Sequence, residues 1–191
     1  MSRPRGLRVI AGSARGRKLV APVGDAVRPT KDIVREAVFS ALDARGALAD
    51  ASVLDLFAGT GALAIEALSR GAARAVLVER DRSALAAIAE NVETLGFGDR
   101  VRVIAADVGA TLRGPQPASA PFDLVFVDPP YGTDDADVTA VLAALDAPGW
   151  LAEDALVAVE RPARHAVALP PGWQTGWERE FGDTLASFCW R

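Results

Sequence analysis

Two hydrophobic patterns follow one another along the chain. Short alternating runs at residues 7–11 and 17–20 flank a glycine-rich turn, which predicts a small β-hairpin or two edge strands. Apolar positions then recur every three or four residues as far as about Ala44, with Thr30 as the expected N-cap, and this spacing predicts a helix. Gly46 ends that helix, so the first fifty residues form a hairpin-and-helix unit.

From Ser52 onward, buried-type strands alternate with amphipathic helices. The expected strands cover residues 53–57, 75–79, 101–105, 122–128 and 155–160, and the expected helices cover 62–70, 81–95 and 138–145. This alternation is typical of an α/β fold with a parallel, Rossmann-like sheet. Runs at 173–181 and 184–190 surround Gly182-Asp183 and predict a C-terminal antiparallel hairpin at the sheet edge. We therefore expect a basic N-terminal extension, 1–48, and an α/β domain, 49–191.

Charge is divided unevenly between these parts. Nine basic residues against two acidic ones give residues 1–35 a charge of +7, while the whole chain carries −4 and its remainder −11. A basic arm on an acidic body suits an anionic polymer that touches one face of the protein. A solubilising tail is the alternative, but this segment also carries strand and helix patterning.

The remaining composition excludes several classes of protein. Of 191 residues, half are hydrophobic and 24% charged, as in ordinary globular proteins. Cys189 is the single cysteine, so no disulfide forms within the chain, which suits a reducing cytoplasm. No run approaches eighteen apolar residues. We expect a monomeric cytoplasmic protein with no membrane segment and no metal.

The strongest chemical signal is Asp128-Pro129-Pro130-Tyr131, directly after the apolar run 122–127. The Asp128 carboxylate and the Pro129 carbonyl can each accept a hydrogen from an exocyclic amine, while Tyr131 stacks on the ring that bears it. The prolines have a fixed φ and no N–H, so no competing donor intrudes. The alternative is a strand end followed by a turn in which Tyr131 only packs.

A second motif lies between the first strand and its helix. Gly59, Gly61 and Ala64 fit G-x-G-x-x-A, and Glu79 ends the next strand, which satisfies a dinucleotide fingerprint. Asp55, Asp107 and Asp128 also come at or near strand ends, so one edge of the sheet collects four acids. A negative rim repels a pyrophosphate and favours the cationic sulfonium of S-adenosylmethionine. For Asp107, a helix N-cap is an equally good interpretation.

These motifs resemble a known family. The segments 55–61 and 128–131 are similar to class I S-adenosylmethionine-dependent N-methyltransferases. The segments 8–12, 15–19, 28–30, 34–39, 66–72 and 182–184 resemble the RsmD-type bacterial 16S ribosomal RNA guanine-N2 methyltransferases. Ile33 stands where that family usually has arginine, which removes one phosphate contact.

The resemblance implies methylation of the exocyclic N2 of one guanine, on assembled or assembling 30S particles. It places base binding and catalysis at Asp128, Pro129, Pro130 and Tyr131. It places S-adenosylmethionine at Asp55, Phe57, Ala58, Gly59, Gly61, Glu79, Asp107 and Val108, with Glu79 on the ribose hydroxyls and Asp107 on the adenine amine. The RNA-binding arm has the residues Arg8, Arg15, Arg17, Lys18, Arg28, Lys31 and Arg35, which hold phosphates without distinguishing sequence.

Three other functions fit parts of the sequence. A methyltransferase acting on DNA adenine or cytosine, or on a protein glutamine, also presents a planar amine to such a motif, although these enzymes more often carry Asn in place of Asp128. A non-catalytic RNA-binding module would not need Asp128 and Tyr131. An NAD-dependent dehydrogenase conflicts with the acidic rim.

Overall fold

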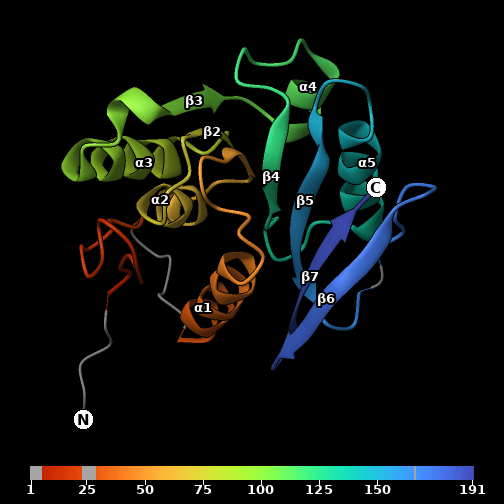
Figure 1. The fold of residues 1–191 in the computed structure, drawn as a ribbon, viewed down its shortest axis with the longest axis horizontal. Coiled ribbons are helices and arrows are strands. Elements are labelled where there is room, and N and C mark those ends of the chain that lie inside the picture. The colour runs from red at the N-terminus through yellow and green to blue at the C-terminus, as the bar shows by residue number, and fades with distance from the viewer. Residues whose placement is uncertain (1–5, 23–28, 166) are drawn as a thin grey trace.

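The computed structural model describes residues 6–22, 29–165 and 167–191, which build one seven-stranded sheet in the order β3-β2-β1-β4-β5-β7-β6 (Figure 1). The strands are β1 Ser52–Leu56, β2 Arg74–Glu79, β3 Val101–Ala105, β4 Phe122–Val127, β5 Leu151–Pro162, β6 Gln174–Phe181 and β7 Thr184–Trp190. β1 to β5 pair in parallel, and β7 runs antiparallel to both β5 and β6. The expected α/β fold class and its antiparallel C-terminal hairpin are confirmed.

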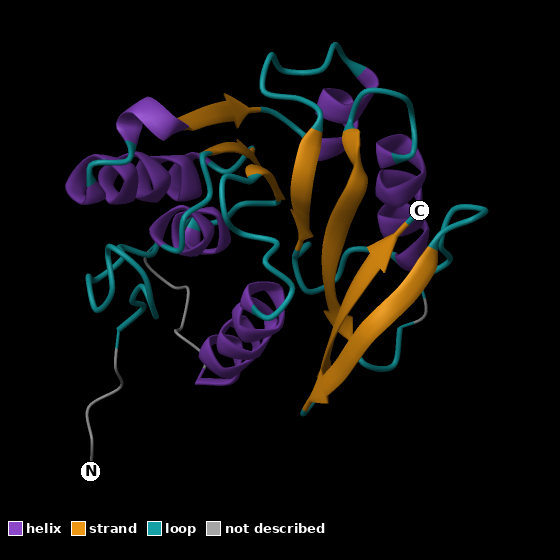
Figure 2. Cartoon of the chain, in the orientation of Figure 1, coloured by secondary structure: helices purple, strands orange, loops and turns teal. Residues whose placement is uncertain are grey.

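Helices cover both faces of the sheet (Figure 2). They are α1 Pro29–Asp43, α2 Ala62–Ser69, α3 Arg82–Leu95, α4 Val108–Arg113 and α5 Asp135–Leu145, with a short 3₁₀ turn, η1 Gly98–Arg100. α1, α2 and α3 pack into one apolar core, and α4 and α5 pack into the other. Within β4, Phe126 faces the first core and Val127 the second, which is the alternation that a two-sided sheet requires.

The N-terminal extension is part of the main core. Val9 and Leu19 are buried in the same cluster as the side chains of α2 and β4. Phe39 of α1 lies with its ring centroid 5.5 Å from that of Phe126 in β4. The extension is therefore packed onto the α/β domain and is not a tail.

The predicted N-terminal hairpin is wrong in one respect, because its strands shrink to a single bridge between Arg8 and Lys18. Val9 N donates to Arg17 O over 3.0 Å, so the two segments do run antiparallel. Beyond that bridge, backbone donors that a ladder would use are bonded to the side chains of helices α2 and α3. The segment thus attaches to helices instead of extending as a β-ladder.

Other elements differ from expectation mainly in length. α4 was not expected at all, since its six residues include Gly109 and show too little periodicity. α5 begins at Asp135 rather than Val138, and β5 runs from Leu151 to Pro162 rather than over 155–160. α1 begins at Pro29, one residue before the expected N-cap.

In the part of the chain that the structure describes, no helix is long and apolar enough to cross a membrane.

Candidate active site

The parallel strands bring four loops to one edge of the sheet. Leu56 of β1 pairs with Val78 of β2 and Val127 of β4, and Glu79 of β2 pairs with Ala105 of β3. The loops that follow these strands therefore lie side by side, and they line a cavity of about 1530 Å³. All four predicted catalytic residues line it, as do six of the eight predicted cofactor residues. Asp55 and Gly61 lie behind its wall.

The glycine loop begins with a backbone conformation that few side chains adopt. Phe57 has a φ of 62°, in the left-handed region that is unusual for a bulky residue. Gly59 and Gly61 follow at 55° and 74°. A Cβ at Gly61 would lie 3.0 Å from Leu77 Cδ2, whereas one at Gly59 would meet only the Phe57 carbonyl at 3.9 Å. Gly61 therefore serves close packing, and Gly59 lies at the open side of the loop.

Asp55 lies under this loop and is 1% exposed. Its Oδ2 accepts the Ala64 N–H at 3.1 Å, while Oδ1 is buried and has no partner among the described residues. Burial raises the pKa of Asp55 to about 8, and the negative charges of Asp128 and Glu79 also raise it, against the hydrogen bond from Ala64. A buried polar oxygen without a partner is uncommon in native proteins, and such groups often mark functional sites.

Glu79 fastens the glycine loop to the end of β2. Its Oε2 accepts the Gly59 N–H at 2.8 Å, and its Oε1 accepts the N–H groups of Arg80 and Asp81 at 2.7 and 2.8 Å. A carboxylate has about four acceptor sites, so roughly one remains for a ligand hydroxyl. The ribose contact expected for Glu79 stays a prediction.

Asp107 is the N-cap of α4, where Oδ1 accepts the Ala110 N–H at 3.0 Å. Its Oδ2 lies 3.2 Å from the exposed guanidinium of Arg80. The capping interpretation is therefore confirmed, and contact with an adenine amine stays a prediction. Val108, the next residue, is buried and contributes to the cavity wall.

The Asp128–Tyr131 loop follows β4 directly. The Pro130 carbonyl accepts from Gly132 N, Thr133 N and Thr133 Oγ1 at 2.8, 3.0 and 2.9 Å, which folds the loop into a compact turn. Among the described residues, no donor is placed on the neighbouring Pro129 carbonyl. The Tyr131 ring is 50% exposed at the cavity. The loop thus presents a carboxylate, an open carbonyl and an aromatic face to one space.

The predicted RNA-binding residues divide into exposed and buried groups. Arg15, Arg17 and Lys18 are exposed on the N-terminal segment, where Arg17 also donates to Thr94 O at 2.8 Å. Arg35 is only 5% exposed and donates to Arg8 O at 2.7 Å and to Asp32 at 3.0 Å. A buried arginine engaged in this way holds the segment in place and offers little surface to a phosphate.

Two predicted RNA contacts cannot be placed. Arg28 lies outside the described residues, and of Lys31 only the backbone, within α1, is described.

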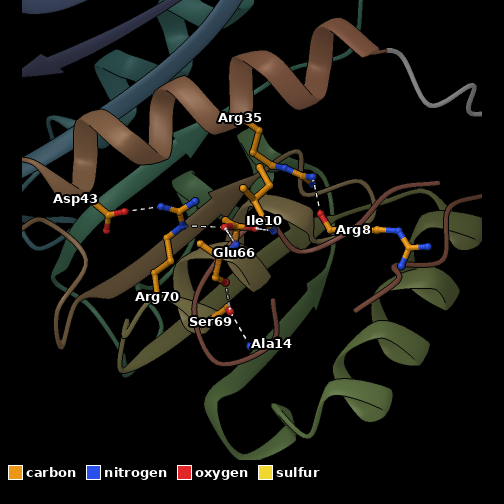
Figure 3. Close-up of polar contacts among 9 residues, drawn as sticks. Arg8, Ile10, Ala14, Arg35, Asp43, Glu66, Ser69 and Arg70 are labelled. Atoms are coloured by element: carbon orange, nitrogen blue, oxygen red, sulfur yellow. Dashed lines mark hydrogen bonds and ion pairs between the residues drawn. The ribbon is translucent and has the colours of Figure 1, made fainter. Parts of the chain in front are cut away.

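Glu66 and Ser69 of α2 attach the N-terminal segment (Figure 3), a role that the sequence analysis did not assign to segment 66–72. Glu66 accepts the N–H groups of Ile10 and Ala11 at 2.7 and 2.9 Å, and Ser69 Oγ accepts the Ala14 N–H at 2.9 Å. Their signal in the sequence is a glutamate and a serine on an otherwise apolar helix, ALAIEALS. Polar side chains in such positions need specific partners.

A buried amide joins the same segment to the glycine loop. Asn91 of α3 accepts the Val20 N–H at 2.7 Å and donates to Val20 O and Thr60 O, both at 3.0 Å. The exposed basic segment is thereby connected, through one side chain, to the loop at which the cofactor is expected.

Comparisons with known proteins agree with this arrangement. A family model described as conserved hypothetical protein 95 matches residues 7–190. The ribosomal RNA small subunit methyltransferase D of Escherichia coli K12 is 39% identical over 178 residues, which is 93% of this chain and 86% of that protein. A protein of the same name from Haemophilus influenzae is 34% identical, covering 92% and 89%. The solved structure of a hypothetical protein from Thermus thermophilus superposes with a TM-score of 0.79 at 31% identity, covering 95% and 98%.

Proposed function

Because the chain belongs to the conserved hypothetical protein 95 family and is 39% identical to a small-subunit ribosomal RNA methyltransferase, we propose that it methylates 16S ribosomal RNA. The group modified is the exocyclic N2 of one guanine, and the methyl donor is S-adenosylmethionine. One observation carries the proposal: the glycine loop and the Asp128–Tyr131 loop line the same cavity.

The residues around the glycine loop fit S-adenosylmethionine better than a dinucleotide. Asp55 provides an unpaired buried oxygen beneath the loop, and Glu79 and Asp107 give the rim a negative character. A pyrophosphate would meet these acids at close range, whereas a sulfonium and an ammonium are attracted to them. When bound, S-adenosylmethionine supplies an electrophilic methyl group. Asp55 and the Gly59 backbone would hold its methionine end, and Glu79 its ribose.

The Asp128–Tyr131 loop offers two hydrogen-bond acceptors that can activate the exocyclic nitrogen of guanine, which is a weak nucleophile. The lone pair of guanine N2 is delocalised into the ring. Hydrogen bonds from its two N–H groups to the Asp128 carboxylate and the Pro129 carbonyl favour a tetrahedral nitrogen and direct its lone pair outward. The carboxylate would also stabilise the positive charge that develops on nitrogen as the N–C bond forms and the donor's S–C bond breaks, with the sulfur leaving as a neutral thioether. The methylated nitrogen then releases one proton to solvent, so no strong base is required.

Tyr131 and the exposed basic residues would hold the RNA. The half-exposed ring of Tyr131 offers a stacking face for a base turned out of its helix. Arg15, Arg17 and Lys18 lie on the exposed N-terminal segment and would contact phosphates. The resemblance to RsmD-type enzymes implies that the substrate is the assembled or assembling 30S particle.

The test is methyl transfer from tritiated S-adenosylmethionine to 30S particles from a strain that lacks the enzyme, followed by mapping of the labelled nucleotide. We expect a single labelled N2-methylguanine with the wild-type protein. Asp128→Ala should lower turnover by about a hundredfold, comparable to losing an oxyanion donor, with cofactor binding kept.

Asp154→Asn serves as the matched control, because it removes an exposed carboxylate of β5 that does not line this cavity. If tritium appears in DNA adenine or in a protein glutamine and none appears in the 30S particles, the protein is another class of N-methyltransferase. Unchanged turnover in Asp128→Ala would remove that carboxylate from the mechanism.

A further inference from the structure

The only tyrosine of the chain is tethered to a residue far away in sequence. The Tyr131 hydroxyl donates to Asp183 Oδ2 at 2.5 Å. A hydrogen bond to a carboxylate is shorter and stronger than one between neutral groups. Tyr131 is half exposed, so this bond adds a point of attachment to a side chain that packing covers only in part.

Asp183 is itself held in place by the backbone around it. It lies in the two-residue turn between β6 and β7, where Phe181 pairs with Thr184. Gly182 takes the turn's first central position with a φ of 64°, which is typical of tight hairpins. The Asp183 carbonyl accepts the Ala163 N–H at 2.8 Å, which fixes the turn to the segment after β5. The Asp183 carboxylate therefore lies on a turn that is hydrogen-bonded to the segment after β5.

The same C-terminal region holds the other end of the loop. Arg161, near the end of β5, is buried, donates to Thr133 O at 3.4 Å and forms an ion pair with Asp135 at the start of α5. His165 Nδ1 lies 2.9 Å from the same Asp135 oxygen. Residues 131 to 135 are therefore held at several points by side chains from the end of β5 and from the β6–β7 turn.

We propose that Asp183 is a positioning residue that fixes the Tyr131 ring in the orientation in which it stacks on the target guanine. The inference rests on the proposed function, in which Tyr131 contacts the base; Asp183, which also lines the cavity, acts through Tyr131. A phenylalanine at position 131 would offer the same aromatic face, so the hydroxyl is needed only if the tether matters. The C-terminal hairpin then acts on catalysis through the Tyr131–Asp183 hydrogen bond.

Four variants test the tether on 30S particles: Asp183→Ala, Asp183→Asn, Tyr131→Phe and the double variant Asp183→Ala/Tyr131→Phe. Losing a hydrogen bond to a charged group should lower kcat/KM by about tenfold or more in Asp183→Ala and in Tyr131→Phe. The double variant should be no worse than either single one, because both remove the same bond. Asp183→Asn keeps an acceptor oxygen and should recover much of the activity.

Glu180→Ala is the matched control, since Glu180 is an exposed carboxylate on the same hairpin and does not line the cavity. It should keep wild-type activity, and all variants should keep their affinity for S-adenosylmethionine. Wild-type activity in Asp183→Ala, or losses that add up in the double variant, would overturn the proposal.

A measurement without RNA separates this inference from the proposed function. With ring-labelled tyrosine, the protein gives one set of ring NMR signals, because Tyr131 is the single tyrosine. Asp183→Ala should shift or broaden those signals, and Glu180→Ala should leave them in place. If wild-type protein does not methylate the particles, the function fails while the ring signals still decide the tether. Unchanged ring signals in Asp183→Ala would refute the tether even in an active enzyme.

Discussion

Burial gives Asp55 a character different from that of the other acids at the sheet edge. Glu79 and Asp107 accept hydrogen bonds from backbone N–H groups, and Asp107 also pairs with Arg80. Asp55 receives one N–H, and burial raises its pKa to about 8. At neutral pH it is therefore mostly a protonated, neutral acid, ready to ionise beside a cationic ligand.

This raised pKa makes stability depend on pH in a defined direction. An unfolded Asp ionises near 3.8 and the folded Asp55 near 8, so between these values the folded state keeps a proton that the unfolded chain has lost. The contribution of Asp55 to stability is complete below the lower value and falls by about 1.4 kcal/mol per pH unit up to the higher one. The side chain of Asp55→Asn does not titrate, so this variant lacks that pH dependence.

Urea unfolding of both proteins should show that the wild-type protein loses unfolding free energy relative to Asp55→Asn as the pH rises from 5 to 8. Above pH 8 the difference between the two proteins should stay constant. A difference that is the same at both ends of the range would contradict the buried, protonated state. Asp154→Asn reports the effect of losing one exposed carboxylate under the same conditions.

Among the elements, those set by local signals were predictable and those set by distant partners were not. The parallel strands and their helices follow from buried apolar runs and from glycines at the turns. The N-terminal strands were overpredicted because Glu66 and Asn91, more than fifty residues away, take their backbone donors. Arg35 lies on the helix face that packs inward, which only the tertiary structure decides.

The site divides in the same way. Asp128 to Tyr131 and the glycine loop were recognisable because their chemistry lies in contiguous residues. The contact of Asp183 with Tyr131 was not, because the two residues are fifty-two positions apart and meet only once the sheet is assembled. The capping role of Asp107 was one of two interpretations that its neighbours in the sequence allowed.

α3 supports the glycine loop through Asn91, whose side chain donates to Thr60 O. Asn91→Ala would leave the Val20 N–H and two carbonyls without their partner in a partly buried place. We expect a loss of about 1–3 kcal/mol in unfolding free energy and weaker binding of S-adenosylmethionine, measured by urea unfolding and calorimetry. Glu90→Ala changes an exposed neighbour on the same helix and should alter neither quantity. Wild-type cofactor affinity in Asn91→Ala would show that the loop needs no such support.

Taken as one body, the protein combines a negative net charge of −4 with an exposed basic segment. Since that segment is docked on α2 and shares the main core, deleting it would remove buried apolar side chains along with positive charge. The contribution of this basic segment to RNA binding is therefore better tested by neutralising its exposed charges than by deleting it.

Arg15→Gln combined with Lys18→Gln should weaken binding to 30S particles. The slope of log affinity against log salt should become shallower by about 0.7–0.9 for each phosphate that the protein no longer neutralises. Affinity for S-adenosylmethionine should not change. Arg102→Gln, at an exposed position of the edge strand β3, should leave the slope as it is. An unaltered slope in the double variant would place the RNA on another face.

The position of β7 has a consequence for synthesis. β7 follows β6 in the sequence but lies between β5 and β6 in the sheet, and among the described residues β7 is the strand that pairs with β6. A nascent chain can therefore pair its five parallel strands early, but it cannot attach β6 or bring the β6–β7 turn against Tyr131 until β7 has left the ribosome. A chain cut before β7 would keep the glycine loop and lack the β6–β7 turn at the cavity.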